Sequence, residues 1–225
     1  MSGAIYGGEE TGAVVFEVGA YETKAGIAGE DLPSCMFSSS SGYLPAAAVD
    51  GMDTDVADDA KPTKKRSPYY IGHQNNVYRE DMTIKCPVED GVIVDWDLYE
   101  AHLHYAMSEL SCNPEEHPIL VGDEAWSSRE QREKLTEIMF ETYKTPAYFL
   151  GKKPVLSAFA NGKSNALVFD MGLSGGSVVP VYEGYAIQKA ITRTNLSASL
   201  LLNVYQSYLE SQNITVVPKF MISKR

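Results

Sequence analysis

The sequence has few cysteines and no long apolar run. Its three cysteines, Cys35, Cys86 and Cys112, are widely spaced, which fits neither a disulfide framework nor a zinc site and favours a reducing, intracellular setting. No apolar stretch approaches the length of a membrane span, and the N-terminus lacks the basic and apolar segments of a signal peptide. We therefore expect no membrane association, and we interpret the sequons at Asn195 and Asn213 as chance matches.

Positive charge is also scarce. The 225 residues include 19 lysines and arginines against 30 aspartates and glutamates, a formal net charge of −11. Phosphate backbones repel a chain of this sign, so we expect no direct DNA binding, and any association with nucleic acid would be local or mediated by partner proteins. The 44% hydrophobic fraction is enough for one or two packed domains.

A short internal repeat indicates two related lobes. Segment 13–19 (AVVFEVG) recurs as 166–172 (ALVFDMG), so that each apolar run ends in a carboxylate, Glu17 or Asp170, then a spacer and a glycine. Continuous apolar runs of this length are typical of strands buried on both faces. We expect each lobe to open with a central buried strand and a tight turn; a chance repeat is the alternative.

Helical periodicity and end signals predict the other elements. We expect four helices. The first runs from Leu98 to Leu110 with Asp95 or Asp97 as its cap, the second follows a capping box of Ser127 and Glu130, the third runs from about Pro154 to Gly162, and the fourth begins after Asn195. We also expect three further strands, at 119–122, 147–150 and 178–182. This mixture predicts an α/β layered fold.

Residues 38–68 break the pattern. Four serines at 38–41 are followed by five aspartates between 50 and 59 and by the basic triplet at 64–66. This composition is typical of a solvated or disordered insertion. The triplet either forms a nuclear-import element or simply belongs to a charged loop.

Residues 172–176 (GLSGG) match the nucleophile elbow of serine hydrolases, but their context excludes that activity. The elbow requires a helix after its serine and a histidine further downstream. Here an expected strand follows Ser174, and all four histidines precede it. His102 and His104, two positions apart on one helix, face different sides and cannot chelate one metal together.

What remains is a glycine-rich turn after each repeated strand. Two such turns facing each other would aim backbone N–H groups at a nucleoside triphosphate, and Asp170 would hold a hydrated Mg²⁺. The alternative is two ordinary tight turns with glycines at positive φ; no P-loop or dinucleotide motif occurs. The candidate nucleotide-binding residues are Gly19, Ala20, Tyr21, Glu22, Lys24, Gly172, Leu173, Ser174 and Gly175.

At the level of whole segments the sequence resembles the actin family. The likeness covers nearly the whole chain outside 38–68, and the segments closest to conventional actin are 88–97 (VEDGVIVDWD), 115–118 (EEHP), 132–143 (REKLTEIMFETY) and 182–186 (YEGYA). The segments more similar to the actin-related protein 4 branch, also called actin-like protein 6, are 1–3, 6–9, 12–16 and 77–82.

The resemblance implies two duplicated RNase H-like lobes with ATP and Mg²⁺ between them. Residues 1–37 and 69–160 would form the first lobe, without its C-terminal return. Residues 38–68 would form the divergent insertion, and residues 161–225 would begin an incomplete second lobe. The actin fold continues well beyond Arg225, so the chain is expected to be a fragment, a short isoform or a truncated gene product. Helices such as Ser197–Leu209 would then expose apolar faces.

The resemblance also implies a function. The branch works in the nucleus together with actin, docked on a long helix of a remodeller's scaffold ATPase. It is shared by chromatin-remodelling and histone acetyltransferase complexes, so the implied partners are actin, that helix, other chromatin-complex subunits and histones.

Departures from actin argue against catalysis. Glu17 replaces an aspartate and Ala20 a serine of the first phosphate loop, and Leu173 replaces an aspartate of the second, whereas Lys24, Asp170 and Gly172 are retained. The residue that orients the attacking water is replaced by Lys153, and the histidine that assists it by Ser177. Orienting the nucleophile is most of what a protein adds to phosphoryl transfer. We therefore assign no catalytic residue and expect hydrolysis to be slow or absent.

Two enzyme readings are the alternatives. One is a conventional actin-like ATPase that forms cytoskeletal filaments; the replaced water-orienting positions and the divergent 38–68 segment argue against it. The other is a sugar kinase of the same superfamily, which would need a catalytic base that the actin-like motifs do not supply.

Overall fold

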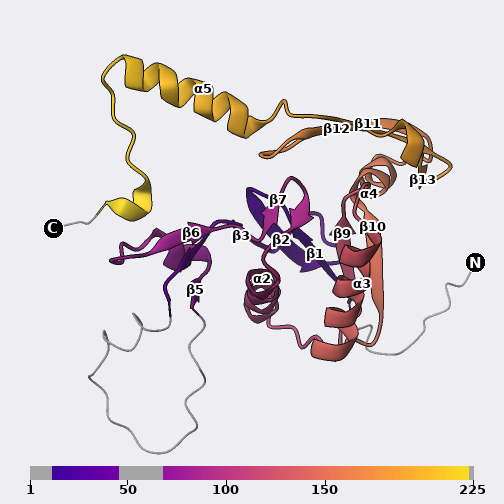
Figure 1. Cartoon of the computed structure of the whole chain (residues 1–225). Coiled ribbons are helices and arrows are strands. Elements are labelled where there is room, and N and C mark those ends of the chain that lie inside the picture. The colour runs from indigo at the N-terminus through magenta and orange to yellow at the C-terminus, as the bar shows by residue number, and fades with distance from the viewer. Residues whose placement is uncertain (1–11, 46–67, 223–225) are drawn as a thin grey trace, which may run out of the picture.

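A five-stranded mixed sheet forms the centre of the computed structural model, which describes residues 12–45 and 68–222 (Figure 1). The strand order is β10-β9-β1-β2-β3. β1, β9 and β10 run parallel, whereas β1–β2 and β2–β3 are antiparallel. The strands are β1 (Val14–Val18), β2 (Glu22–Ile27), β3 (Cys35–Ser38), β9 (Ile119–Asp123) and β10 (Tyr148–Lys152). The predicted α/β class and the expected strands at 119–122 and 147–150 are confirmed.

Two helices cover one face of this sheet, α2 (Trp96–Glu109) and α3 (Arg129–Glu137), the latter extended by the π-helical turn η2 (Ile138–Thr142). Alternate side chains of β1, such as Phe16, point at this face and share one buried core with Leu103 of α2 and Leu135 of α3. Burial of this apolar surface is the main stabilising contribution.

The helix caps partly agree with the prediction. Asp95 caps α2 and accepts a hydrogen bond from the Leu98 N–H at 2.9 Å. α3, however, is capped by Ser128, whose hydroxyl accepts from the Gln131 N–H at 3.3 Å. The predicted capping box at Ser127 is therefore wrong by one residue, because the Ser127 N–H instead closes a turn onto the Glu124 carbonyl.

The predicted insertion is shorter than expected, because residues 38–45 are ordered parts of the fold. β4 (Ser41–Tyr43) pairs with β5 (Tyr69–Tyr70) and with β6 (Thr83–Lys85). Ser39 and Ser41 are buried, since their hydroxyls bond the Thr23 hydroxyl (2.9 Å) and the His102 ring (2.8 Å). The aspartates and the basic triplet lie outside the described residues. The small elements η1 (Gly72–Asn76), β7 (Val88–Glu89) and β8 (Val92–Ile93) complete this lobe.

The second lobe follows α4 (Lys153–Ala160), which has Pro154 in its first turn and Gly162, at φ 65°, just beyond its end, as predicted. A four-stranded sheet then forms, with β11 at one edge. Its elements are β11 (Ala166–Met171), β12 (Gly176–Tyr182), β13 (Tyr185–Ala186), η3 (Gln188–Ala190) and β14 (Thr192–Thr194), followed by α5 (Ala198–Ser211) and η4 (Lys219–Met221). Because β12 is a strand, the hydrolase elbow lacks its helix.

The sequence repeat corresponds to two equivalent hairpins. Glu17 on β1 pairs with Lys24 on β2, and Asp170 on β11 pairs with Ser177 on β12, in each case seven positions later. The expectation that both strands are buried on both faces is wrong for β11, where the side chains of Leu167 and other apolar residues are exposed. β11 pairs with β12 alone, at the edge of its sheet.

Helix α5 projects away from the rest of the molecule (Figure 1). The Ser197 hydroxyl caps it by accepting from the Leu200 N–H at 3.2 Å. Its predicted exposed apolar face is confirmed: the exposed side chains are Leu200, Leu201, Leu202, Val204, Tyr205 and Tyr208. Within the described residues, no helix combines the length and apolarity needed to cross a bilayer.

Candidate nucleotide site

The two glycine-rich turns line a single cleft of about 490 Å³ between the lobes. The structure thus brings together groups that the sequence separates by about 150 residues. Every predicted site residue lines this cleft: Gly19, Ala20, Tyr21, Glu22 and Lys24 from the first turn, Asp170, Gly172, Leu173, Ser174 and Gly175 from the second, and Lys153 and Ser177. Nucleotide binding at these residues remains a prediction.

Close contacts constrain Gly19, Gly175 and Gly176, whereas the alternative of ordinary tight turns with glycines at positive φ is not borne out for them. Gly19, Gly172 and Gly175 are absent from the described glycines with positive φ. A Cβ on Gly19 would lie 3.1 Å from the Glu22 carbonyl oxygen, and one on Gly176 would lie 2.9 Å from Cγ2 of Thr194. Larger residues would therefore push the turns apart.

Part of each turn's backbone is already engaged. The Gly19 N–H donates to the Glu22 carbonyl (3.1 Å), and the Gly172 N–H donates to the Gly175 carbonyl (2.9 Å). The first turn of α5 is tied to the second loop, since the Ala198 N–H donates to the Gly172 carbonyl at 3.0 Å. A phosphate would therefore use the N–H groups of later turn residues, such as Ala20 and Ser174.

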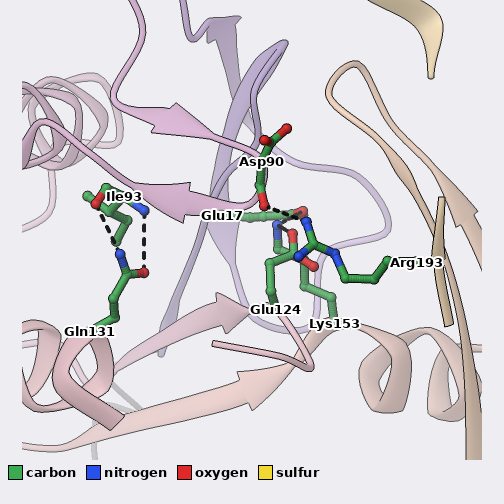
Figure 2. Close-up of polar contacts among 7 residues, drawn as sticks. All are labelled: Glu17, Asp90, Ile93, Glu124, Gln131, Lys153 and Arg193. Carbon is green, nitrogen blue, oxygen red and sulfur yellow. Dashed lines mark hydrogen bonds and ion pairs between the residues drawn. The ribbon is translucent and has the colours of Figure 1, made fainter. Parts of the chain in front are cut away.

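A buried lysine joins two carboxylates at the floor of the cleft (Figure 2). Nζ of Lys153 lies 3.2 Å from Oε1 of Glu17 and 2.8 Å from Oε1 of Glu124. The Lys153 and Glu124 side chains are only 16% and 17% exposed, and that of Glu17 is 40% exposed. Burial by itself lowers the pKa of Lys153, but the carboxylates of Glu124 and Glu17 more than offset it, so that the pKa is raised. The lysine is therefore held as an ammonium.

Parallel strand pairing creates this cluster. β1, β9 and β10 are adjacent and parallel, so their carboxyl ends meet at one edge of the sheet, where ligands bind in open α/β sheets. Glu17 lies near the end of β1, Glu124 follows β9 and Lys153 follows β10. Glu124 was not among the predicted site residues, although its position two residues beyond the predicted strand at 119–122 was an available signal.

Arg193 connects the lobes across the cleft (Figure 2). Its Nη2 donates to the Asp90 carbonyl at 3.1 Å, and its guanidinium carbon lies 4.5 Å from the ring centroid of Trp126. The β7–β8 hairpin that carries Asp90 is itself anchored to α3, because Gln131 both donates to the Ile93 carbonyl (3.0 Å) and accepts from the Ile93 N–H (3.3 Å). No short sequence motif indicated Arg193.

Asp170 and Ser177 lie side by side on the second lobe. Asp170 is exposed and Ser177 is buried. Within residues 12–45 and 68–222, no three histidine, cysteine, aspartate or glutamate side chains gather as a metal site. The hydrated Mg²⁺ expected at Asp170 remains a prediction, as one carboxylate would hold it only together with phosphate oxygens and water.

Comparisons with known proteins agree with this architecture. The family model described as Actin matches residues 8–225. Proteins named actin-related protein 4 are similar over 98% of the chain: 36% identical in Arabidopsis thaliana, 34% in Oryza sativa subsp. indica and 33% in Yarrowia lipolytica. The chain spans about half the length of these curated relatives, 53%, 53% and 50% respectively. The actin-like fold predicted from the sequence is confirmed, and the chain belongs to the actin family.

Proposed function

We propose that this chain is a non-catalytic actin-related subunit of nuclear chromatin-remodelling and histone acetyltransferase complexes, which binds ATP without hydrolysing it efficiently. The proposed partners are actin, the long helix of a remodeller's scaffold ATPase, other chromatin-complex subunits and histones. Membranes and direct contacts with DNA have no part in it. The similarity to proteins named actin-related protein 4 supports the proposed class.

The observation that carries the proposal is the pairing of Lys153 with Glu17 and Glu124. An amide side chain at this position would offer a carbonyl oxygen to orient an attacking water, whereas an ammonium has donors and no acceptor. Its donors already engage two carboxylates. Lys153 therefore neither orients a water for attack nor accepts its proton, the contributions that phosphoryl transfer to water requires.

Exposed apolar surface indicates that further protein covers parts of this chain. α5 and β11 present leucine, tyrosine and phenylalanine side chains to solvent, and the rest of an actin fold or a partner protein would bury such side chains. The acidic net charge of −11 favours basic partners such as histone tails over nucleic acid.

Phosphate release from ATP tests the non-catalytic part. With conventional actin as the reference, the 225-residue chain is expected to release phosphate at the background rate, because the water-orienting groups are replaced. Binding of fluorescent ATP is measured in the same samples, so that failure to bind is distinguished from failure to hydrolyse. Turnover comparable with that of actin would favour the filament-forming ATPase and contradict the proposal.

Affinity purification tests the assembly role. The tagged chain, added to nuclear extract, is expected to recover actin and a remodeller ATPase subunit. A matched control chain carries Leu201→Lys and Tyr205→Lys on the exposed face of α5. These substitutions should reduce the recovery of both partners without unfolding the first lobe. Recovery of neither partner by a chain that circular dichroism shows to be folded would contradict the proposal.

A further inference from the structure

Lys153 lies where the sheet concentrates negative charge. Glu17 and Glu124 come from the ends of two neighbouring parallel strands, and their Oε1 atoms both contact the same ammonium. Without a cation between them, two partly buried carboxylates that can both reach one ammonium would repel each other. A cation is therefore an electrostatic requirement of this edge of the sheet.

A divalent metal ion commonly neutralises a pair of carboxylates, but the donors present here do not fit one. Mg²⁺ needs nearly octahedral oxygen ligands at about 2.0–2.1 Å. One oxygen of each carboxylate, Oε1 of Glu17 and Oε1 of Glu124, is already paired with the Lys153 ammonium. A divalent ion entering between Glu17 and Glu124 would also meet the repulsion of the ammonium at close range.

We infer that Lys153 is the resident cation of this cleft, and that its ammonium excludes divalent metal ions from the position between Glu17 and Glu124. The lysine is attached to the chain and mostly buried, so it does not exchange with solvent ions. It remains charged at neutral pH because the neighbouring carboxylates raise its pKa. This inference concerns the chain without nucleotide and does not depend on whether ATP binds, nor on a metal ion that ATP would carry in with its phosphates.

Binding of Mn²⁺ to the complete 225-residue chain without nucleotide, followed by electron paramagnetic resonance, tests the inference. The wild-type chain should bind Mn²⁺ only weakly. Lys153→Met removes the charge at similar side-chain length and leaves two carboxylates facing each other, so it should bind Mn²⁺ about tenfold or more tightly. The matched control is Lys152→Met, which removes the neighbouring lysine. Among the ion pairs described for residues 12–45 and 68–222, Lys152 makes none with Glu17 or Glu124. This variant should bind Mn²⁺ as weakly as the wild type does.

Two results would overturn the inference. One is wild-type binding as tight as that of Lys153→Met. The other is no gain in a Lys153→Met chain whose circular dichroism matches the wild type. Adding Glu17→Gln to Lys153→Met should abolish the gain, because one of the two ligands is then neutral.

Thermal unfolding keeps the test decisive should Lys153→Met fail to fold. The Tm of the wild-type chain should be the same in Mg²⁺ as in a chelator, since Lys153 already supplies the positive charge. A wild-type Tm that rises with Mg²⁺, with the rise lost in Glu17→Gln, would show that a divalent ion binds between Glu17 and Glu124 and would overturn the inference.

Discussion

The two lobes carry the same strand motif in opposite environments. On β1, Val14 and Phe16 are both 0% exposed; their counterparts in the repeat, Leu167 and Phe169 on β11, are 70% and 61% exposed. β1 lies between β2 and β9 and beneath two helices, whereas β11 pairs with β12 alone. An apolar run therefore specifies a strand, whereas the burial of that strand depends on which other elements are present to cover it.

The two lobes also differ in how far their helices are buried. α2 contributes six buried residues to the first lobe, among them Leu103 and His102, whereas α5 contributes none. Both helices have 14 residues and a side-chain cap at their N-terminus. Local signals therefore suffice to form a helix in each lobe, but only α2 gains the free energy of apolar burial.

Truncating the equivalent phenylalanines Phe16 and Phe169 should show the largest difference in free energy of unfolding between the two lobes. Phe16→Ala is expected to lower the free energy of unfolding by about 4 kcal/mol, because it leaves a cavity in the core. Phe169→Ala should change it by under about 0.5 kcal/mol, since the side chain is already in water. Urea unfolding followed by far-ultraviolet circular dichroism, to which the helices and strands of both lobes contribute, measures both changes. Equal effects would mean that β11 is covered in solution.

The buried polar cluster should make the first lobe sensitive to acid. Burial lowers the pKa of His102 from its usual 6.5 to about 4, although Asp95 opposes this. The folded state therefore favours the neutral ring: its stabilising contribution is complete above pH 6.5 and is lost as the pH falls through about 4. Between about pH 7 and pH 4 this loss should be about 3 kcal/mol.

His102→Gln provides the comparison for that pH dependence. Urea unfolding of this variant across the same pH range should lack the loss attributed to His102, while His104→Gln, on the exposed side of the same helix, should retain it. An unchanged pH dependence in His102→Gln would assign the acid sensitivity to other groups.

The contact between the lobes should have the smallest effect. Arg193→Ala removes the hydrogen bond to the Asp90 carbonyl and the stacking on Trp126, contributions of about 1 kcal/mol together. Hydrogen exchange should become about fivefold faster in residues 88–93 and 185–197, as this free energy implies. Arg129→Ala, which breaks the exposed pair with Glu133, should leave both segments unchanged. Equally fast exchange in both variants would mean that Arg193 does not hold the lobes together.

Local patterns predicted much of the fold and the members of the site. The helical period of α2 and one of its two candidate N-caps, Asp95, were predicted correctly, because a helix end depends on residues three or four positions away. The serines at 38–41 were misread as the start of an insertion, because their polar side chains suggested solvent, whereas Thr23 and His102, distant in sequence, satisfy Ser39 and Ser41 in the interior.

The two hairpins and their glycine-rich turns could be predicted from the sequence, since each of them depends on a few consecutive residues. The position of Lys153 between Glu17 and Glu124 and the exposure of β11 became visible only in the folded chain. Those outcomes depend on which strands pair and which helices pack on them. Such pairings join residues far apart in the sequence, as Lys153 is from Glu17 and Glu124, and no local pattern specifies these contacts.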